Sequence, residues 1–450
     1  MPLGVRDLHS VGRAENQSAV RRISGGMSSS TTRLQWPDVA KGVCILLVVL
    51  HHVTGKQYGM VVPGGLGVAE DAWLWVTAAL KPIRMPLFFA VSGFFAASSI
   101  DRPWAAVGKR IVNPYYVYVV WLVVFAGIYS VERTLPANRT DGPVDFLTEL
   151  VWAATSMWFL FALAVYFALA KALRRVPAPV VLVAAAALAL ATSWMPLDET
   201  NRVAVLAHFG YFAFGAYYPQ LFRRLASLRL PLLVLLPLYV ALTVALDAAG
   251  ARHSVTVLVL SLVGVPMGVV AAVRLSRTAG SRPLAWLGQR TLQVYVLHMA
   301  VLAVVVHLPI GTDLGWAPAS LLLTAAYPVL MTGSITMVCL CLHRLLVSRG
   351  LGFLFAAPSA LMDAVRRVGH DPSGDPARPA RDRCAAGPRT DGGLERQPTR
   401  DRRLRGRRPG LAALRDADPR PDPRGGRGGP GRYGPALQPQ LLVPPQRSAG

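Results

Sequence analysis

WPDVAKGVCILLVVLHHV, residues 36–53, is the stretch that decides the class of fold. At about 1.5 Å per residue, a helix of this length nearly crosses the roughly 30 Å of hydrocarbon in a bilayer. Its ionisable side chains are Asp38, Lys41, His51 and His52, and the apolar residues between them run without the alternation of a barrel strand. The stretch is therefore predicted to be a transmembrane helix.

Comparable apolar runs recur along the chain to about residue 347. Of the 450 residues, 53% are hydrophobic and 16% are charged, a balance that ordinary soluble domains do not show. Lipid admits only helices or closed barrels, so the predicted fold class is all-α, a polytopic integral membrane helical bundle of about ten transmembrane helices. The predicted helices are 38–54, 73–99, 112–130, 146–170, 178–196, 203–222, 231–248, 255–273, 285–307 and 317–347.

The connections between these helices alternate in charge. Odd-numbered connections are acidic or mixed, whereas even-numbered connections are basic, so the positive-inside rule predicts that both termini are cytosolic. The formal net charge of +23 would suggest a nucleic-acid partner in a soluble protein, but its placement in short loops and a tail indicates membrane topology instead. No nucleic-acid partner is expected. The basic connections contain Arg102, Lys109, Arg110; Lys171, Arg174, Arg175; Arg223, Arg224, Arg229; Arg274, Arg277, Arg282 and Arg290.

Two polar segments flank the predicted transmembrane domain, which covers residues 35–348. Residues 1–34 contain several arginines and no apolar core, so they are expected to form a disordered cytosolic N-terminus rather than a signal peptide. Residues 365–450 are rich in Arg, Pro and Gly and are expected to be a disordered basic tail. The tail is either an arm that lies on anionic lipid headgroups or an extension without function.

The cysteines do not indicate a metal site. No pair has the spacing of a zinc site, and we expect neither a bound metal nor a disulfide. The cysteines are Cys44, Cys339, Cys341 and Cys384.

Lys41 and His52 face the same side of the first predicted helix. Their separation is close to three full turns, which places the side chains within about 20° of each other and about 16 Å apart along the axis. Asp38 lies near the same stripe. An imidazole at this position suits a general base for a hydroxyl, because its unperturbed pKa is about 6.5. Alternatively, one of the adjacent histidines bonds a neighbouring helix and the other faces an aqueous vestibule.

Arg84 stands between Pro82 and Pro86 in the second predicted helix. Two prolines so close should break or kink the helix, which is tolerated at depth only beside protein or a water-filled cavity. Counted inward from the outer face, Arg84 falls roughly mid-membrane, at a depth comparable with that of His52. There its guanidinium could hold a thioester carbonyl, a phosphate or a carboxylate. The alternative is that Arg84 lies at a headgroup boundary.

The segments DVAKGVCILLVVLHH, RMPLFFAVSGFF, KRIVNPYYVYVVW, WFLFALAVYF and TLQVYVLHMAVL follow one another in the chain. Together, over about residues 33–347, they resemble the membrane-bound acyltransferase-3 family of bacterial O-acyltransferases. The most specific element is a basic residue, ten intervening positions and a histidine, here Lys41 and His52, where many relatives have arginine for the lysine. RMPLFFAVSGFF is most similar to the sugar O-acetylase branch. The chain departs from larger members in lacking a recognisable esterase-like domain and a clear Arg-x-Arg element, since only Lys81 and Arg84 follow the first loop.

The resemblance implies a multi-pass enzyme of the bacterial inner membrane. It would transfer an acyl group, with acetyl expected, from acyl-coenzyme A to a hydroxyl of a carbohydrate or lipid-linked glycan. Acyl-coenzyme A is then a co-substrate and no cofactor stays bound, while membrane lipids and the glycan acceptor are the expected partners. His52 would be the general base or a transient acyl carrier, and Arg84 would stabilise the oxyanion or position the donor. Lys41 would contact a phosphate of coenzyme A or lock Asp38 at the cytosolic rim. Asp38, Lys109 and Arg110 are the other residues expected to serve coenzyme A there, although Lys109 and Arg110 satisfy the topology rule without any ligand.

Three further residues are weaker candidates. His298, in the segment VYVLH, would orient the substrate or His52, or else make a structural hydrogen bond. Trp158 either stacks on the substrate sugar or packs between helices. His208 lies near the outer end of its predicted helix, where an interfacial histidine is ordinary. In AVSGFF, Gly93 indicates a close contact between helices.

A transporter or flippase is the main rival function. Histidines within the membrane and broken helices are natural in transporters as well. No paired halves with matching interruptions are detectable in this sequence, which favours the enzyme. A structural member of the family without turnover is a third alternative.

Overall fold

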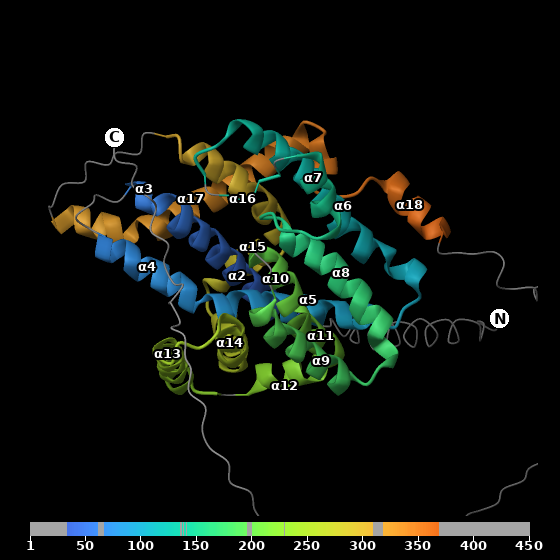
Figure 1. Cartoon of the computed structure of the whole chain (residues 1–450), viewed down its shortest axis with the longest axis horizontal. Coiled ribbons are helices and arrows are strands. Elements are labelled where there is room, and N and C mark those ends of the chain that lie inside the picture. Colours follow the sequence, from blue (N-terminus) through green and yellow to red (C-terminus); the bar gives the residue numbers. More distant parts are fainter. Residues whose placement is uncertain are drawn as a thin grey trace, which may run out of the picture. The chain divides into compact units, whose positions relative to one another are not determined.

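The computed structural model describes residues 34–61, 67–135, 137, 139–140, 142–195, 200–228, 230–308 and 318–368. Every regular element within these residues is a helix, so the all-α prediction is confirmed (Figure 1). Residues 1–33 and 369–450, which carry most of the predicted disordered segments, lie outside the described residues. The first residues of the expected tail, up to Val368, belong to a helix instead, α18 Ser359–Val368.

The described helices include five that are long and apolar enough to cross a membrane. A sixth candidate is the bent pair of α12 Pro219–Ser227 and α13 Leu232–Ala248. Two further helical segments are apolar but shorter, Ala178–Trp194 and Thr291–Val305. The chain is thus a multi-pass membrane protein, but the count of about ten spans is not confirmed. The five spans are Trp36–Val61, Val68–Ile100, Ala106–Val131, His253–Leu275 and Thr324–Ser348.

Two of the predicted helices are broken in the structure. The predicted helix 146–170 is divided into α7 Pro143–Val151 and α8 Trp158–Ala172. Between them the Glu149 carboxylate accepts the backbone N–H groups of Ala154 at 2.7 Å and Thr155 at 3.0 Å, which stabilises the turn. These bonds to a side chain replace the backbone hydrogen bonds of a continuous helix. A hydropathy pattern does not reveal them.

The predicted helix 203–222 is broken twice. It becomes α10 Thr200–Ala207, α11 Phe209–Tyr217 and α12, with His208 at the first break. Pro219 occupies the first turn of α12, where its missing N–H is tolerated. A continuous apolar run therefore hides three short helices.

The first two spans agree better with prediction. The first consists of α2 Trp36–Val53, the π-helical turn η1 Thr54–Tyr58 and α3 Gly59–Val61. The second consists of α4 Gly67–Ala79 and α5 Lys81–Ile100, which meet at Leu80. The predicted interruption near the two prolines is this boundary, since Pro82 fits the first turn of α5. The remaining helices are α6 Trp104–Val131, α9 Ala178–Ala191, α14 His253–Leu275, α15 Ser281–Gly288, α16 Thr291–Val305 and α17 Pro318–Ser348, with 3-10 turns η2 Leu173–Arg175, η3 Thr192–Trp194 and η4 Leu351–Leu354.

Helix α2 lies at the centre of the bundle and contacts α5, α14, α15, α16 and α17 (Figure 1). Where α2 crosses α15, the two backbones are in direct contact. A Cβ on Gly42 would collide with the carbonyl of Leu284, and one on Gly288 would collide with the carbonyl of Asp38. Small residues permit such approach between membrane helices. The crossing holds the first turns of α2 against α15.

Helices α5 and α11 cross in the same way. A Cβ on Gly93 would meet the Phe212 carbonyl, and one on Gly215 would meet the Ala90 carbonyl. The close contact predicted at Gly93 is therefore confirmed. This close crossing holds α5 against α11, and α5 also contacts α2.

Contacts between connections define the two ends of the bundle. At one end, which we call the basic end, the Lys171 ammonium donates to the carbonyl of Ile100 at 3.0 Å, and the Arg274 guanidinium donates to the carbonyl of Leu230 at 2.8 Å. The first turn of α2 joins this end through Gln35, whose amide donates to Ser281 Oγ at 3.4 Å. The even-numbered, arginine-rich connections therefore meet at one end, as their charge pattern predicts.

The opposite end joins the first loop to the start of the last span. Tyr58 donates to the carbonyl of Thr324 at 2.7 Å, and Trp73 Nε1 donates to that of Ala325 at 3.1 Å. Thr192 and Ser254 hydroxyls bond at 2.8 Å. These are odd-numbered connections, so the two sets of connections are separated in space.

Candidate functional site

The polar track along α2 runs from the basic end toward the opposite end. Lys41 and His52 stand on one uninterrupted helix, as predicted. The Lys41 ammonium lies 5.4 Å from the centre of the Phe95 ring on α5, a cation–π distance. The lysine is half-buried, with its stem in the bundle and its charge near the basic end.

His52 meets His298 of α16 in the interior. Their ring centroids lie 5.2 Å apart, with an interplanar angle of 36°. His298 is only 1% exposed, whereas His52 is half-buried. The prediction that His298 orients His52 is untested, but the structure places the two imidazoles in contact. The ring of His52 thus faces protein and not lipid.

The tautomer of His298 is determined by its own helix. Its Nδ1 lies 2.7 Å from the Tyr295 carbonyl and 3.1 Å from the Val294 carbonyl. Carbonyl oxygens only accept, so Nδ1 carries the hydrogen and, in the neutral ring, Nε2 carries the lone pair. Neither His298 Nε2 nor His52 Nδ1 has a hydrogen-bond partner among the described residues. Two buried imidazole nitrogens are therefore available for a proton or a substrate hydroxyl.

Tyr295 anchors α16 in this position. Its hydroxyl donates to the Ser156 carbonyl at 2.7 Å and accepts the N–H of Phe159 at 3.2 Å. The Tyr295 and His298 rings lie 5.9 Å apart. The break before α8 leaves the Ser156 carbonyl and the Phe159 N–H without helical partners. Both bond Tyr295 and so hold α16, the helix that carries His298.

Arg84 lies on the other flank of α2. It is 3% exposed, and its Nη1 donates to the carbonyl of Leu47 at 3.3 Å, one turn before His51. Within the described residues it forms no ion pair, and its Nε has no hydrogen-bond partner. His51 and His52 rings lie 5.3 Å apart. The guanidinium is therefore held beside the turn of His51, while His52 turns toward α16.

A buried guanidinium without a carboxylate costs free energy, so Arg84 stays a candidate for a functional residue. The predicted depth of Arg84, comparable with the histidines, agrees with its contact on α2. Its expected role toward an acyl donor is not decided by this contact.

Asp38 is 2% exposed at the first turn of α2. Its Oδ2 accepts from the Gln289 side-chain amide at 3.2 Å, at the junction of α15 and α16. The Gly288 crossing described above brings these groups together. Asp38 thus ties α2 to the connection that leads into the helix of His298.

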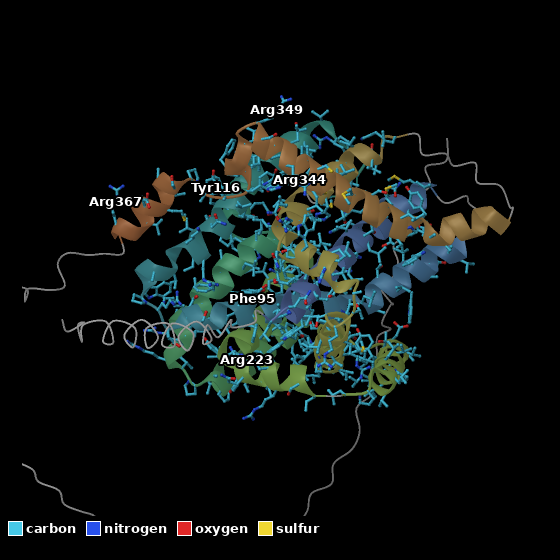
Figure 2. All side chains as sticks on the ribbon, turned by 180° about the vertical axis from the view of Figure 1, so that it is seen from behind. Phe95, Tyr116, Arg223, Arg344, Arg349 and Arg367 are labelled. Atoms are coloured by element: carbon cyan, nitrogen blue, oxygen red, sulfur yellow. The ribbon has the colours of Figure 1, made fainter. Side chains whose placement is uncertain are left out.

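A cavity of about 490 Å³ opens near Lys41 at the basic end. Phe94, Phe95 and Arg223 are among its lining residues, and the Arg223 guanidinium lies 6.0 Å from the Phe94 ring. Figure 2 shows Phe95 and Arg223 in this part of the bundle. The other polar lining residues are Ser98, Asp101 and Tyr217.

Lys109 and Arg110 are exposed on α6. The Arg110 guanidinium donates to the carbonyl of Phe95 at 3.3 Å, so it approaches the same cavity. No contact connects Lys109 to the cavity or to the histidines among the described residues.

Trp158 lies away from the pair of His52 and His298. Its ring is 5.7 Å from Phe89 and 5.8 Å from His208, and its side chain is half-buried. Its packing between α5, α8 and the break before α11 agrees with the alternative that it fills space between helices. Phe159, next in sequence, is the residue that reaches Tyr295.

Sequence reasoning missed several residues of this site. Gln289, Tyr295 and Arg223 were not predicted, although each had a signal in the sequence. Gln289 is an amide in the short polar step before the helix of His298, and Tyr295 precedes that histidine by one turn. Arg223 follows an aromatic run and had been assigned only to topology. Within the described residues, no group of three His, Cys, Asp or Glu side chains is arranged to hold a metal ion.

Comparison with known proteins adds independent information. Residues 34–344 match a family model described as an acyltransferase domain, acyltransferase-3. The chain is similar to inner membrane protein YcfT of Escherichia coli (strain K12), with 27% identity over 347 residues that cover 72% of this chain and 96% of the relative. No solved structure matches the chain significantly.

Two nodulation proteins match a shorter part of the chain. Nodulation protein NolL of Mesorhizobium japonicum is 29% identical over 141 residues, and NolL of Sinorhizobium fredii is 30% identical over 139 residues. Each match covers 30% of this chain and 35% of the relative. These two similarities therefore extend over about a third of the nodulation proteins.

Proposed function

The chain belongs to the acyltransferase-3 family, and from that premise we propose that it is an integral membrane O-acyltransferase. It moves an acyl group, acetyl in the first instance, from acyl-coenzyme A to a hydroxyl of a carbohydrate or lipid-linked glycan. The observation that carries this proposal is the buried contact between His52 and His298, at the end of α2 that lies farther from Lys41 and the basic end.

The reaction requires one proton acceptor and one group for the developing oxyanion. The acceptor hydroxyl loses its proton to His52 as its oxygen forms a bond to the thioester carbon. The carbon–sulfur bond then breaks, and the coenzyme A thiolate takes up the proton. His298 holds the protonated His52 through its lone pair on Nε2, since its Nδ1 hydrogen is committed to backbone carbonyls. His298 is thus a positioning residue for the base.

Arg84 provides the positive charge on the other flank. Its guanidinium is buried and has spare N–H donors, so it stabilises the tetrahedral oxyanion or holds the donor carbonyl. The guanidinium sits beside the turn of His51, next to His52, so the proposal places the reacting carbonyl between Arg84 and His52.

The donor enters from the basic end. Lys41 and the cavity lined by Phe94, Phe95 and Arg223 offer positive charge and aromatic surface for the nucleotide part of coenzyme A. Arg110 and Lys109 extend this positive surface on α6. Asp38 accepts a hydrogen bond from Gln289. This bond fixes α2, which carries Lys41, against the connection that leads into the helix of His298. By the positive-inside rule the basic end faces the cytosol of a bacterial cell, with both termini on that side.

The acceptor reaches the histidines from the opposite end or from the lipid. Trp158 is proposed as part of the wall on the acceptor side, through Phe159 and Tyr295, which contact it and His298 in turn. Membrane lipids surround the bundle.

Label transfer in detergent tests the proposal. Purified protein is given radiolabelled acetyl-coenzyme A and a panel of glycans, conditions under which vectorial transport has no meaning. We expect transfer to an acceptor in the wild type and a loss of about 10²–10⁴-fold in His52→Ala, the range for a general base. His307→Ala is the matched control, because its side chain is 54% exposed and lies far from α2 in sequence.

The same variants separate the enzyme from a transporter. If vesicles that contain His52→Ala still move a lipid-linked sugar and no label transfer is seen with the wild type, the protein is a flippase and the acyltransferase proposal fails.

A further inference from the structure

A second polar cavity lies between α5, α9, α10, α11 and α14. Its volume is about 120 Å³, and neither His52 nor His298 lines it. The helices that surround it contact one another, and Figure 1 shows α9, α11 and α14 grouped on one side of the bundle. Ser254 in its lining bonds Thr192, which places the cavity toward the end opposite the basic end. The polar lining residues are Lys81, His208, Tyr211, His253 and Ser254.

The cavity is lined by one lysine, Lys81. Lys81 Nζ lies 3.3 Å from Nε2 of His253, so the ammonium donates one of its three hydrogens to this ring. Among the described residues, no carboxylate lines the cavity and none forms an ion pair with Lys81. A half-buried ammonium in this setting attracts an oxyanion.

His208 supplies the complementary acceptor. It is 4% exposed, and its Nδ1 lies 2.7 Å from the Ala204 carbonyl, so Nδ1 carries the hydrogen. In the neutral ring Nε2 then has a lone pair, and no hydrogen-bond partner is found for it within the described part of the chain. Phe89 and Trp158 lie 5.6 Å and 5.8 Å from the imidazole and keep it from turning away.

Tyr211 and Ser254 do not compete for a ligand. The Tyr211 hydroxyl bonds Ser261 at 2.8 Å, and the Ser254 hydroxyl bonds Thr192. The groups left for a ligand are therefore the Lys81 ammonium, which has hydrogens beyond the one on His253, and the lone pair on His208 Nε2, which has no partner in the described residues. An anionic oxygen satisfies the first group, and an O–H or N–H donor satisfies the second.

We propose that this cavity binds a small hydroxylated carboxylate, with its carboxylate at Lys81 and its hydroxyl donating to His208 Nε2. The volume limits the bound group to a few heavy atoms, since an engineered cavity of about 150 Å³ holds benzene. A 2-hydroxycarboxylate unit fits this limit, either as a free acid or as the corresponding end of a sugar acid. The two groups that would bind the ligand, Lys81 and His208, are not among the residues proposed for acyl transfer, so the inference stands or falls separately.

Ligand-observed NMR on the full chain in detergent tests the proposal. Glycolate carries both groups, acetate carries only the carboxylate, and ethylene glycol carries only hydroxyls. We expect glycolate to bind about tenfold more tightly than either of the other probes, because only glycolate satisfies both groups. Equal affinity for glycolate and acetate, or no binding of glycolate, overturns the proposal.

A fourth probe distinguishes the two sources of the ligand. Gluconate, a sugar acid, carries the same carboxylate and 2-hydroxyl at the end of a polyol chain. Tighter binding of gluconate than of glycolate assigns the site to a sugar acid, and weaker binding assigns it to a free hydroxy acid. Both results support the shared chemistry.

Two substitutions separate the contributions of the two groups. Lys81→Met should weaken glycolate about tenfold and leave ethylene glycol unchanged, whereas Lys81→Arg should retain most of the affinity. His208→Phe should lower the affinity for glycolate to that for acetate. If His208→Phe fails to fold, His208→Gln keeps an acceptor oxygen and should preserve the preference for glycolate. His307→Ala is the control outside the cavity, and glycolate affinity that is unaffected by Lys81→Met overturns the proposal.

Discussion

His52 on the first span and His298 on α16 bring their imidazole rings to 5.2 Å, although most of the chain separates them in sequence. His298 donates its Nδ1 hydrogen to the carbonyls of Val294 and Tyr295, and its Nε2 is buried without a hydrogen-bond partner in the described residues. In the proposed mechanism this pair supplies the base and the residue that positions it. Arg84 lies beside the same helix, where its guanidinium donates to the Leu47 carbonyl.

The first prediction concerns the positioning role of His298. His298→Ala should lower kcat of acyl transfer by about 10–100-fold, less than the loss in His52→Ala, because the base remains but is poorly oriented. The KM for acetyl-coenzyme A should stay within about twofold, since the donor contacts lie near the basic end. Steady-state kinetics with the purified variant measures both values. A rise in KM with unchanged kcat would assign His298 to substrate binding instead.

The second prediction separates function from stability at Arg84. Arg84→Met removes a buried charge that has no ion-pair partner in the described residues, so the melting temperature should stay equal or rise. Activity should fall by about 10²–10³-fold, the usual loss when one oxyanion donor is removed. Thermal unfolding and label transfer are measured on the same preparation. A large fall in melting temperature would show that Arg84 serves the fold.

The third prediction concerns the donor contact of Lys41. Lys41→Met should raise the KM for acetyl-coenzyme A about tenfold, because an ammonium near the basic end attracts the phosphates of the nucleotide. The truncated donor S-acetyl-N-acetylcysteamine lacks those phosphates, and its KM should not change. Kinetics with both donors provides the comparison. An equal rise for both donors would place Lys41 at the thioester or in the support of α2.

The fourth prediction concerns the crossing of α2 and α15. Gly288→Ala places a Cβ against the Asp38 carbonyl, and this overpacking should destabilise the protein by about 1–3 kcal/mol. It should also lower activity, since the shift disturbs the bond between Asp38 and Gln289. Gly333→Ala is the matched control, because a Cβ there meets nothing within 4 Å and alanine favours the helix. The change in melting temperature relative to the wild type should differ between the two variants, either in sign or clearly in size.

Hydropathy predicted the class of protein and several elements. The all-α architecture, the first span with Lys41 and His52 on one helix, and the helix boundary near Pro82 all follow from patterns of neighbouring residues. The grouping of arginine-rich connections at one end also follows, because the rule that governs it depends only on composition and order. The family was recognisable from the same local segments.

The interruption of two predicted helices did not follow from hydropathy. The breaks at Trp152–Met157 and at His208 are made by side-chain and turn bonding, such as the Glu149 carboxylate to the N–H groups of Ala154 and Thr155. An apolar run has the same composition whether or not the helix within it is interrupted. Where the interruption falls depends on which helices pack against it.

The sequence alone therefore determined that the chain is helical, that it crosses the membrane several times, and that His52 lies at the far end of a polar stripe from Lys41. These properties depend on residues within one or two helical turns of one another, and the spacing of side chains along a helix is the same in any protein. Only the tertiary structure decided that His52 faces His298, that Arg84 sits beside His51 and that Asp38 reaches Gln289. Those contacts join helices far apart in sequence, and they depend on how closely backbones approach at residues such as Gly42 and Gly288, which no local pattern encodes.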